Sequence, residues 1–191
     1  MVLSLGIAAC APAAPEGETP TASPLASAGE APASGDAVVF QWPNVTGGGQ
    51  ISNADLAGRV SVLVFVTTYD VPSQAQVRFL TQLSRDHVPR LNVVAVVLEP
   101  PEHQPMAAAY ASTLDLKYPV VMADAATIRG EGPFAGLHHV PAVAILDRQG
   151  RERFRNLGLM DQAALEAAVV KVEEETGVKQ GVPEPASSAT K

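Results

Sequence analysis

The chain has 191 residues, a net charge of −7 and an isoelectric point near 5.0. This length suits one domain with some additional chain, because domains usually contain roughly 100–200 residues. The negative net charge gives no long-range attraction to a phosphate backbone, so we expect no nucleic-acid partner.

The only cysteine, Cys10, ends the apolar stretch "LSLGIAAC". The sequence Ile7-Ala8-Ala9-Cys10 resembles the bacterial lipobox, where a signal peptidase cuts and the new N-terminal Cys receives lipid. We therefore interpret residues 1–10 as a signal segment with Cys10 as the lipidation site. A chance Cys in an apolar leader is the alternative. The segment has no Lys or Arg and is short for a signal peptide, which a start site upstream would explain.

Lipid on Cys10 would anchor the protein to a membrane surface of the bacterial cell envelope, outside the cytoplasm. No later segment has the roughly 18–20 consecutive apolar residues that span a bilayer. Residues 11–36 contain recurrent Pro and neither aromatic nor basic residues, which predicts a disordered tether. The tail, residues 179–191, is interpreted in the same way. The folded domain is expected to occupy residues 37–178.

The domain begins with short β signals. "AVVFQW" predicts one strand, and a Gly-rich turn leads to a second near Gln50–Ser52 and to a helical turn at Asn53–Leu56. Residues 60–66, "VSVLVFV", form a nearly continuous β-branched run. Such a run is typical of a strand covered on both faces, as in a parallel sheet.

An amphipathic helix is predicted from Val71 to His87, because apolar residues recur there at helical spacing. Its buried face is expected to carry Ala75, Phe79, Leu80 and Leu83. Asp70 is a good N-cap, since its carboxylate accepts from orphan N–H groups of the first turn. Pro72 lies where a missing N–H costs nothing.

The remaining pattern again alternates strand and helix signals. We predict strands in 91–99, 118–124, 140–147 and 151–158, helices in 104–116 and from Asp161 to about Glu175, and a short helix and loop in 125–138. The "DRQG" turn joins the last two strands as a hairpin. The final helix is expected to bury Leu165, Val169 and Val172.

Three stretches together resemble one family. "ISNADLAGRVSVLVFVTTY" is similar to a strand and D-L-x-G-K turn that precede a central strand, and "YDVPSQAQVRFL" stands where the family has W-C-x-P-C. "HHVPAVAILDRQGRERFRNLG" is similar to its V-P-x-x-x-x-I-D-x-x-G hairpin, in which the Val-Pro bond is cis. The resemblance is to the thioredoxin fold, in the branch of membrane-anchored, extracytoplasmic disulfide reductases of the TlpA and ResA type.

The resemblance implies an α/β fold: a thioredoxin-like three-layer sandwich with a central mixed β-sheet flanked by helices and an N-terminal β extension. It places the family's active-site segment at residues 69–73. Tyr69 stands for the family's Trp, Asp70 for its attacking Cys and Ser73 for its resolving Cys, with Val71 and Pro72 between them. Pro141 takes the place of the cis-Pro.

Neither Asp70 nor Ser73 can perform disulfide exchange, which needs one thiolate to attack and a second thiol to resolve the mixed disulfide. We therefore expect no disulfide reductase or peroxidase activity, no catalytic residues and no cofactor. A Ser-His-Asp set remains a minor alternative, because the fold would bring His138 or His139 near Asp70 and Ser73.

A metal site is a second minor alternative, with His138, His139, Asp70 and Glu99 as its candidate ligands. Adjacent histidines in an extended segment point to opposite faces, which argues against joint chelation. The plainer interpretation is one solvated and one structural histidine.

The groove beside the cis-Pro does not depend on the cysteines. Backbone groups at Val140 and Pro141 are expected to pair with an extended peptide by strand addition. The sequence therefore predicts a redox-inactive lipoprotein that acts as a binding or scaffold module for an envelope protein or peptide. The alternatives are a TlpA-like thiol-disulfide oxidoreductase that uses partner thiols, or a His/Asp metal-binding variant.

Overall fold

A computed structural model describes residues 35–87 and 89–177. Cys10, the predicted tether as far as residue 34 and the predicted tail lie outside the described residues. The described chain joins the core at Val38, whose side chain is buried and whose N–H donates to the carbonyl of Gly150 at 2.9 Å.

Strands and helices alternate in the predicted order. The strands are β1 (Gln41–Pro43), β2 (Gln50–Ser52), β3 (Ser61–Val66), β4 (Asn92–Val97), β5 (Val120–Met122), β6 (Ala142–Leu146) and β7 (Glu152–Leu157). The helices are α1 (Asn53–Leu56), α2 (Val71–His87), α3 (Gln104–Thr113), α4 (Ala125–Ile128) and α5 (Gln162–Thr176). Two 3₁₀ turns, Pro101–His103 and Gly132–Phe134, were not predicted. No helix of the described chain is both long and apolar enough to cross a membrane.

The main sheet has five strands in the order β5-β4-β3-β6-β7, with β3 at its centre. β3, β4 and β5 are parallel, whereas β6 is antiparallel to both β3 and β7. β1 and β2 form a separate antiparallel pair. The predicted mixed sheet with an N-terminal β extension is confirmed.

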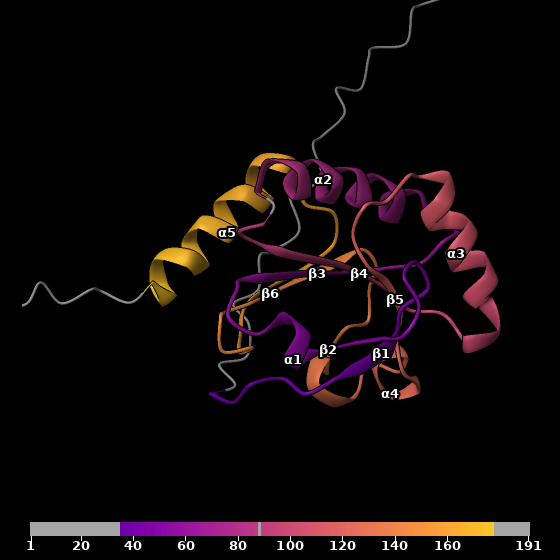
Figure 1. The fold of residues 1–191 in the computed structure, drawn as a ribbon, viewed down its shortest axis with the longest axis horizontal. Helices are drawn as coiled ribbons and strands as arrows, with labels where there is room; N and C mark the ends of the chain where they lie inside the picture. The colour runs from indigo at the N-terminus through magenta and orange to yellow at the C-terminus, as the bar shows by residue number, and fades with distance from the viewer. Residues whose placement is uncertain (1–34, 88, 178–191) are drawn as a thin grey trace, which may run out of the picture.

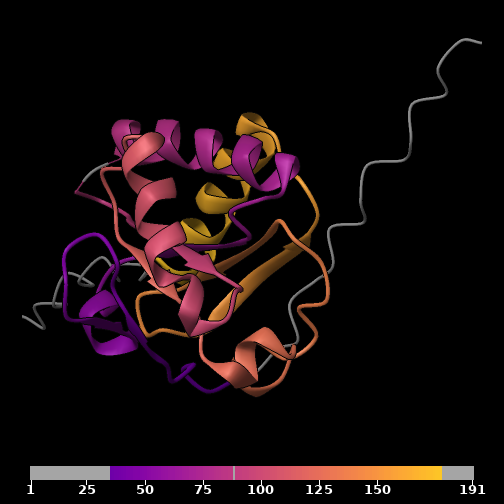
Figure 2. The same cartoon turned by 90° about the vertical axis from the view of Figure 1, so that its right-hand side faces the viewer.

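Layers of side chains cover both faces of this sheet. Val62, Val64 and Val66 of β3 pack into one core with α2, α3 and α5, while Leu63 and Phe65 face the other core. Figures 1 and 2 show α2, α3 and α5 on one side of the sheet, with β1, β2, α1 and α4 on the other. The six buried residues of β3 thus explain its continuous apolar sequence.

Aromatic rings fill the core beneath the N-terminal extension. Trp42 stacks on Phe40 with ring centroids 4.3 Å apart and also contacts Phe65 and Phe134. Its indole N–H donates to the Asp124 carboxylate at 3.1 Å. The short strand β1 is therefore held through its side chains as well as through its pairing with β2.

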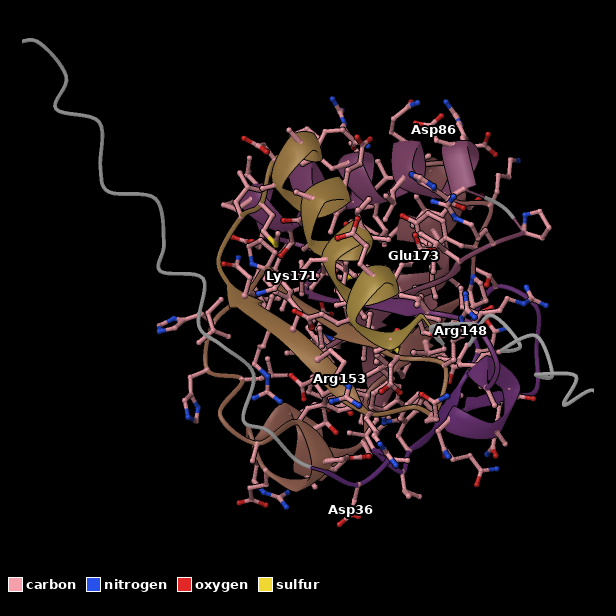
Figure 3. The ribbon with its side chains drawn as sticks, turned by 90° about the vertical axis from the view of Figure 1, so that its left-hand side faces the viewer. Asp36, Asp86, Arg148, Arg153, Lys171 and Glu173 are labelled. Atoms are coloured by element: carbon pink, nitrogen blue, oxygen red, sulfur yellow. The ribbon has the colours of Figure 1, made fainter. Side chains whose placement is uncertain are left out.

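The buried face of α2 differs from the prediction. Leu80 and Leu83 are buried as expected, but Ala75 and Phe79 are only half-buried, and Gln76 and Val77 take the inner positions. Gln76 can lie inside because its Oε1 accepts from the N–H of Met160 at 2.7 Å. Helix α2 packs against α5. Figure 3 shows α5 in front, with Lys171 and Glu173 labelled. Leu165, Val169 and Val172 of α5 are buried, as predicted.

Candidate functional site

The turn after β3 leaves the centre of the sheet and leads into α2. The Oδ2 of Asp70 accepts from the N–H of Ser73 at 2.8 Å, and the carbonyl of Asp70 accepts from the N–H of Gln74 at 3.1 Å. These two bonds define an N-cap, so the capping role predicted for Asp70 is confirmed. The carboxylate is engaged by the backbone at the position where the resemblance places an attacking cysteine.

Ser73 is fully buried, and its Oγ accepts a long hydrogen bond of 3.4 Å from the N–H of Thr67. A nucleophilic hydroxyl must reach the substrate, which the surrounding side chains prevent here. No bond among the described residues joins His138 or His139 to Asp70 or Ser73. The structure therefore does not supply the nucleophile that a Ser-His-Asp set requires.

The other residues of this turn face solvent. Tyr69 is 73% exposed and Val71 is 74% exposed, and Pro72 is exposed between the helix start and Ser73. The turn therefore exposes large hydrophobic side chains on both sides of Asp70, a feature typical of interaction surfaces.

The loop before β6 lies beside this turn because β3 and β6 are antiparallel neighbours, with Phe65 opposite Ala142. The Val140–Pro141 bond is cis, as the resemblance implies, and the carbonyl of Pro141 accepts from the N–H of Gly158 at 2.8 Å. No hydrogen bond between described residues uses the backbone N–H or carbonyl of Val140.

A pocket of about 310 Å³ opens at this loop, and we call it the Val140 pocket. Thr67 from the end of β3 and Leu98 from the end of β4 form part of its wall. Its remaining wall comes from Ile128, Arg129, Leu137, His138, His139 and Val140. Both histidines are exposed, so the structure brings together the predicted loop residues in one open groove.

Glu99, a candidate ligand, is buried and already bonded. Its Oε1 accepts from the N–H and hydroxyl of Thr68, at 2.5 and 2.7 Å, and its Oε2 lies 2.9 Å from Nδ1 of His103. Within 35–87 and 89–177, no three His, Cys, Asp or Glu side chains gather closely enough to hold a metal ion. Glu99 instead fixes the turn after β3 against the end of β4.

A second pocket was missed at the sequence level. It has a volume of about 350 Å³ and lies between the first turn of α2 and the side of α3, where Met106 and Tyr110 are one turn apart. The Met106–Tyr110 spacing indicates a common helix face, but only the tertiary packing shows that this face is hollow. We call this site the Tyr110 pocket.

No family model and no curated protein matches this chain. Solved structures do match it. A thiol:disulfide interchange protein of the thioredoxin family from Chlorobium tepidum TLS is 23% identical, with a TM-score of 0.59 over 72% of this chain and 94% of that chain. A DsbF homologue from Corynebacterium diphtheriae is 15% identical, with a TM-score of 0.63 over 82% of this chain and 98% of that chain.

The pneumococcal exposed lipoprotein thioredoxin Etrx1 of Streptococcus pneumoniae strain TIGR4 is also similar. It is 18% identical, with a TM-score of 0.60 over 70% of this chain and 99% of that chain. At these identities the likeness concerns the fold, and the fold is thioredoxin-like.

Proposed function

We propose that this thioredoxin-like chain is a redox-inactive binding module of the bacterial envelope that holds a protein or peptide in extended form beside Val140. The observation that carries the proposal is the backbone of Val140, whose N–H and carbonyl bond to no described residue at the wall of an open pocket. The chain has no second cysteine to accompany Cys10, which removes the dithiol that disulfide exchange uses.

Strand addition explains how such a site binds. An extended partner satisfies the N–H and the carbonyl of Val140 through its own backbone, which gives affinity without a particular sequence. Its neighbouring side chain enters the Val140 pocket, where Leu98 and Leu137 offer apolar contact. We therefore expect a partner segment with a free extended backbone and one apolar side chain.

We infer that the exposed side chain of Val71 extends this surface, because Val71 ends the turn that begins at Thr67, a wall residue of the Val140 pocket. Tyr69 of the same turn lines the Tyr110 pocket. Apolar surface at an interface contributes to binding when a partner removes it from water. A charged residue at position 71 is therefore expected to weaken binding without disturbing the core.

The envelope location rests on the lipobox-like sequence at Cys10. The name of the similar Streptococcus pneumoniae structure, an exposed lipoprotein thioredoxin, supports the same location. A tether of Pro-rich chain between Cys10 and the domain would carry the Val140 pocket away from the membrane surface.

Photocrosslinking in the native host tests the binding proposal. A benzophenone side chain at position 139, which is exposed at the pocket, is expected to capture one dominant envelope protein from the full-length chain. Val71→Glu should abolish this adduct. Val39→Glu is the matched control, because Val39 is also 74% exposed and lies at the N-terminal extension. Capture that is unaffected by Val71→Glu, or no adduct from the folded chain, would overturn the proposal.

Insulin reduction separates the module from an enzyme that works with partner thiols. We expect dithiothreitol to reduce insulin at the same rate with and without the purified chain. The same result is expected when the captured partner is added with the chain. Turnover above that background would establish the oxidoreductase alternative instead.

A further inference from the structure

A further pocket lies between one side of α2 and the C-terminal end of α3, two helices that cover the same face of the sheet (Figures 1 and 2). Its volume of about 350 Å³ is at the lower end of the range for small-molecule sites, roughly 300–1,000 Å³. The half-buried side chains of Leu114 and Leu116 give it an apolar wall. We call it the Arg78 pocket. Thr113 and Leu114 also line the Tyr110 pocket, so the two pockets are neighbours.

Two exposed arginines of α2, Arg78 and Arg85, line the Arg78 pocket. They are seven residues apart, which places them on the same helix face with about 10 Å between them along the axis, at about 1.5 Å per residue. Thr81 lies between them, and its hydroxyl donates to the carbonyl of Val77 at 2.9 Å. The pocket therefore combines two spaced positive groups with an apolar wall.

Neither arginine is neutralised within the protein. Among residues 35–87 and 89–177, no ion pair or hydrogen bond involves the guanidinium of Arg78 or Arg85. Elsewhere in the chain, Arg129 and Arg153 are paired with carboxylates. Because both guanidinium groups of the pocket are exposed and free of such bonds, they can turn toward a ligand without breaking a contact.

Carboxylates near the Arg78 pocket do not cancel its charge. No Asp or Glu is among its wall residues. Asp86, the neighbour of Arg85 in sequence, accepts from the side-chain amide of Gln82 at 2.9 Å. Asp115, which lies between Leu114 and Leu116 in sequence, is paired with Lys117. The pocket is thus a local site of positive charge on a chain whose net charge is −7.

We propose that the Arg78 pocket binds a linear dicarboxylate with an apolar middle. The planar guanidinium group presents a pair of donors that matches a carboxylate, so one carboxylate pairs with Arg78 and the other with Arg85. The apolar middle lies against Leu114 and Leu116, where its removal from water adds to the affinity. This site is separate from the Val140 pocket and does not depend on a partner held there.

Three probes separate the contributions of charge and apolar contact. Suberate has two carboxylates joined by a methylene chain, dimethyl suberate has the same chain without the charges, and succinate has the charges with a shorter chain. Each is added to the ¹⁵N-labelled full chain at constant ionic strength. Suberate is expected to give saturable amide shifts at residues 78–85 and 113–116, and dimethyl suberate none. Succinate should bind at least about fivefold more weakly than suberate, because it buries fewer methylene groups.

Variants of the two arginines make the test specific. Arg78→Gln and Arg85→Gln each remove one positive charge from an exposed position and should raise the dissociation constant for suberate by about three- to tenfold. Arg148→Gln is the matched control, because Arg148 is also exposed but lies outside the pocket (Figure 3). It should bind suberate as the parent does.

Four results would overturn the proposal. These are no saturable shifts with folded protein at millimolar suberate, equal affinity for suberate and succinate, equal affinity for suberate and dimethyl suberate, or unchanged dissociation constants in both Arg78→Gln and Arg85→Gln. Residues 68, 69 and 106 report on the far side of the Tyr110 pocket. Suberate shifts centred there would place the ligand in that pocket and also contradict the proposal. The amide spectrum of each variant reports its folding in the same experiment.

Discussion

The N–H of Ser73 donates to the carboxylate of Asp70 at 2.8 Å, which gives Asp70 a structural task at the start of α2. Asp70→Ala removes the side chain that caps this turn, and N-caps typically contribute about 0.5–2 kcal/mol. We expect urea unfolding to show a loss in that range. Asp70→Asn, which keeps an acceptor oxygen, should retain most of the stability.

Asp161 caps α5 by the same contact, from the N–H of Ala164 at 2.8 Å, and serves as the comparison. Asp161→Ala should therefore lose a similar amount. If Asp70→Ala were as stable as the parent while Asp161→Ala lost stability, Asp70 would be a functional carboxylate rather than a cap.

Asp124 makes stability depend on pH. Burial disfavours its ionised form, but the hydrogen bonds from Thr127 and Trp42 outweigh burial and hold the pKa of Asp124 below its usual value. Because the folded pKa is the lower one, the stabilisation is complete above the unfolded pKa, about 3.9, and is lost as pH falls through the folded pKa.

Asp124→Asn should therefore flatten the dependence of unfolding free energy on pH below about pH 4. The intrinsic fluorescence of Trp42, the only tryptophan, reports the transition directly. Identical acid unfolding of the parent and Asp124→Asn would contradict the stabilising role given to these hydrogen bonds.

A buried ion pair joins Glu152 and Arg155 on β7. Nε and one terminal nitrogen of Arg155 donate to the two carboxylate oxygens of Glu152 at 2.5 and 2.6 Å, and both residues are buried. Removal of one partner leaves a buried charge unpaired, so Glu152→Ala should lower the unfolding free energy by about 3–5 kcal/mol.

The double variant Glu152→Leu/Arg155→Met should recover much of this loss, since apolar pairs often replace buried ion pairs without destabilisation. Glu131→Ala, which breaks the exposed pair with Arg129, should change stability little. A small loss in Glu152→Ala would indicate that Arg155 reaches water.

The lipobox prediction at Cys10 has a direct test. Cys10→Ser should move the protein from the membrane fraction to the soluble fraction and abolish labelling by a radioactive fatty acid. Unchanged fractionation and labelling would show that the anchor lies elsewhere, whereas an unlabelled parent protein would contradict the lipid anchor itself.

Much of the fold follows from local patterns. The apolar run of β3 and the caps Asp70 and Asp161 appear in the structure where the sequence places them. Such features depend on the alternation, spacing and capping of neighbouring residues, which a sequence displays directly. The resemblance implied that the loop before Pro141 lies near the turn at Asp70, and in the structure Val140 lines one pocket with Thr67, at the start of that turn.

Features that depend on how particular side chains pack or pair in the folded chain were not predicted. The side chain of Gln76 is buried and accepts a hydrogen bond from the N–H of Met160, and the side chain of Arg155 is buried and paired with the carboxylate of Glu152. From the sequence alone, each of these polar residues would be expected at the surface. The hydroxyl of Tyr110, which has no hydrogen-bond partner among residues 35–87 and 89–177, belongs to the same class. Periodicity identifies a helix face but cannot show whether the neighbouring element fills the space against it.

The aspartate at the start of α2 has a consequence for the kinetics of any complex formed at this turn. Neither Asp70 nor Ser73 can hold a partner through a sulfur–sulfur bond, so each bound molecule stays only as long as its non-covalent contacts last. The lifetime of the complex is then set by its dissociation rate constant and does not respond to reductants. Occupancy of the surface follows the partner's concentration rather than the redox state of the compartment.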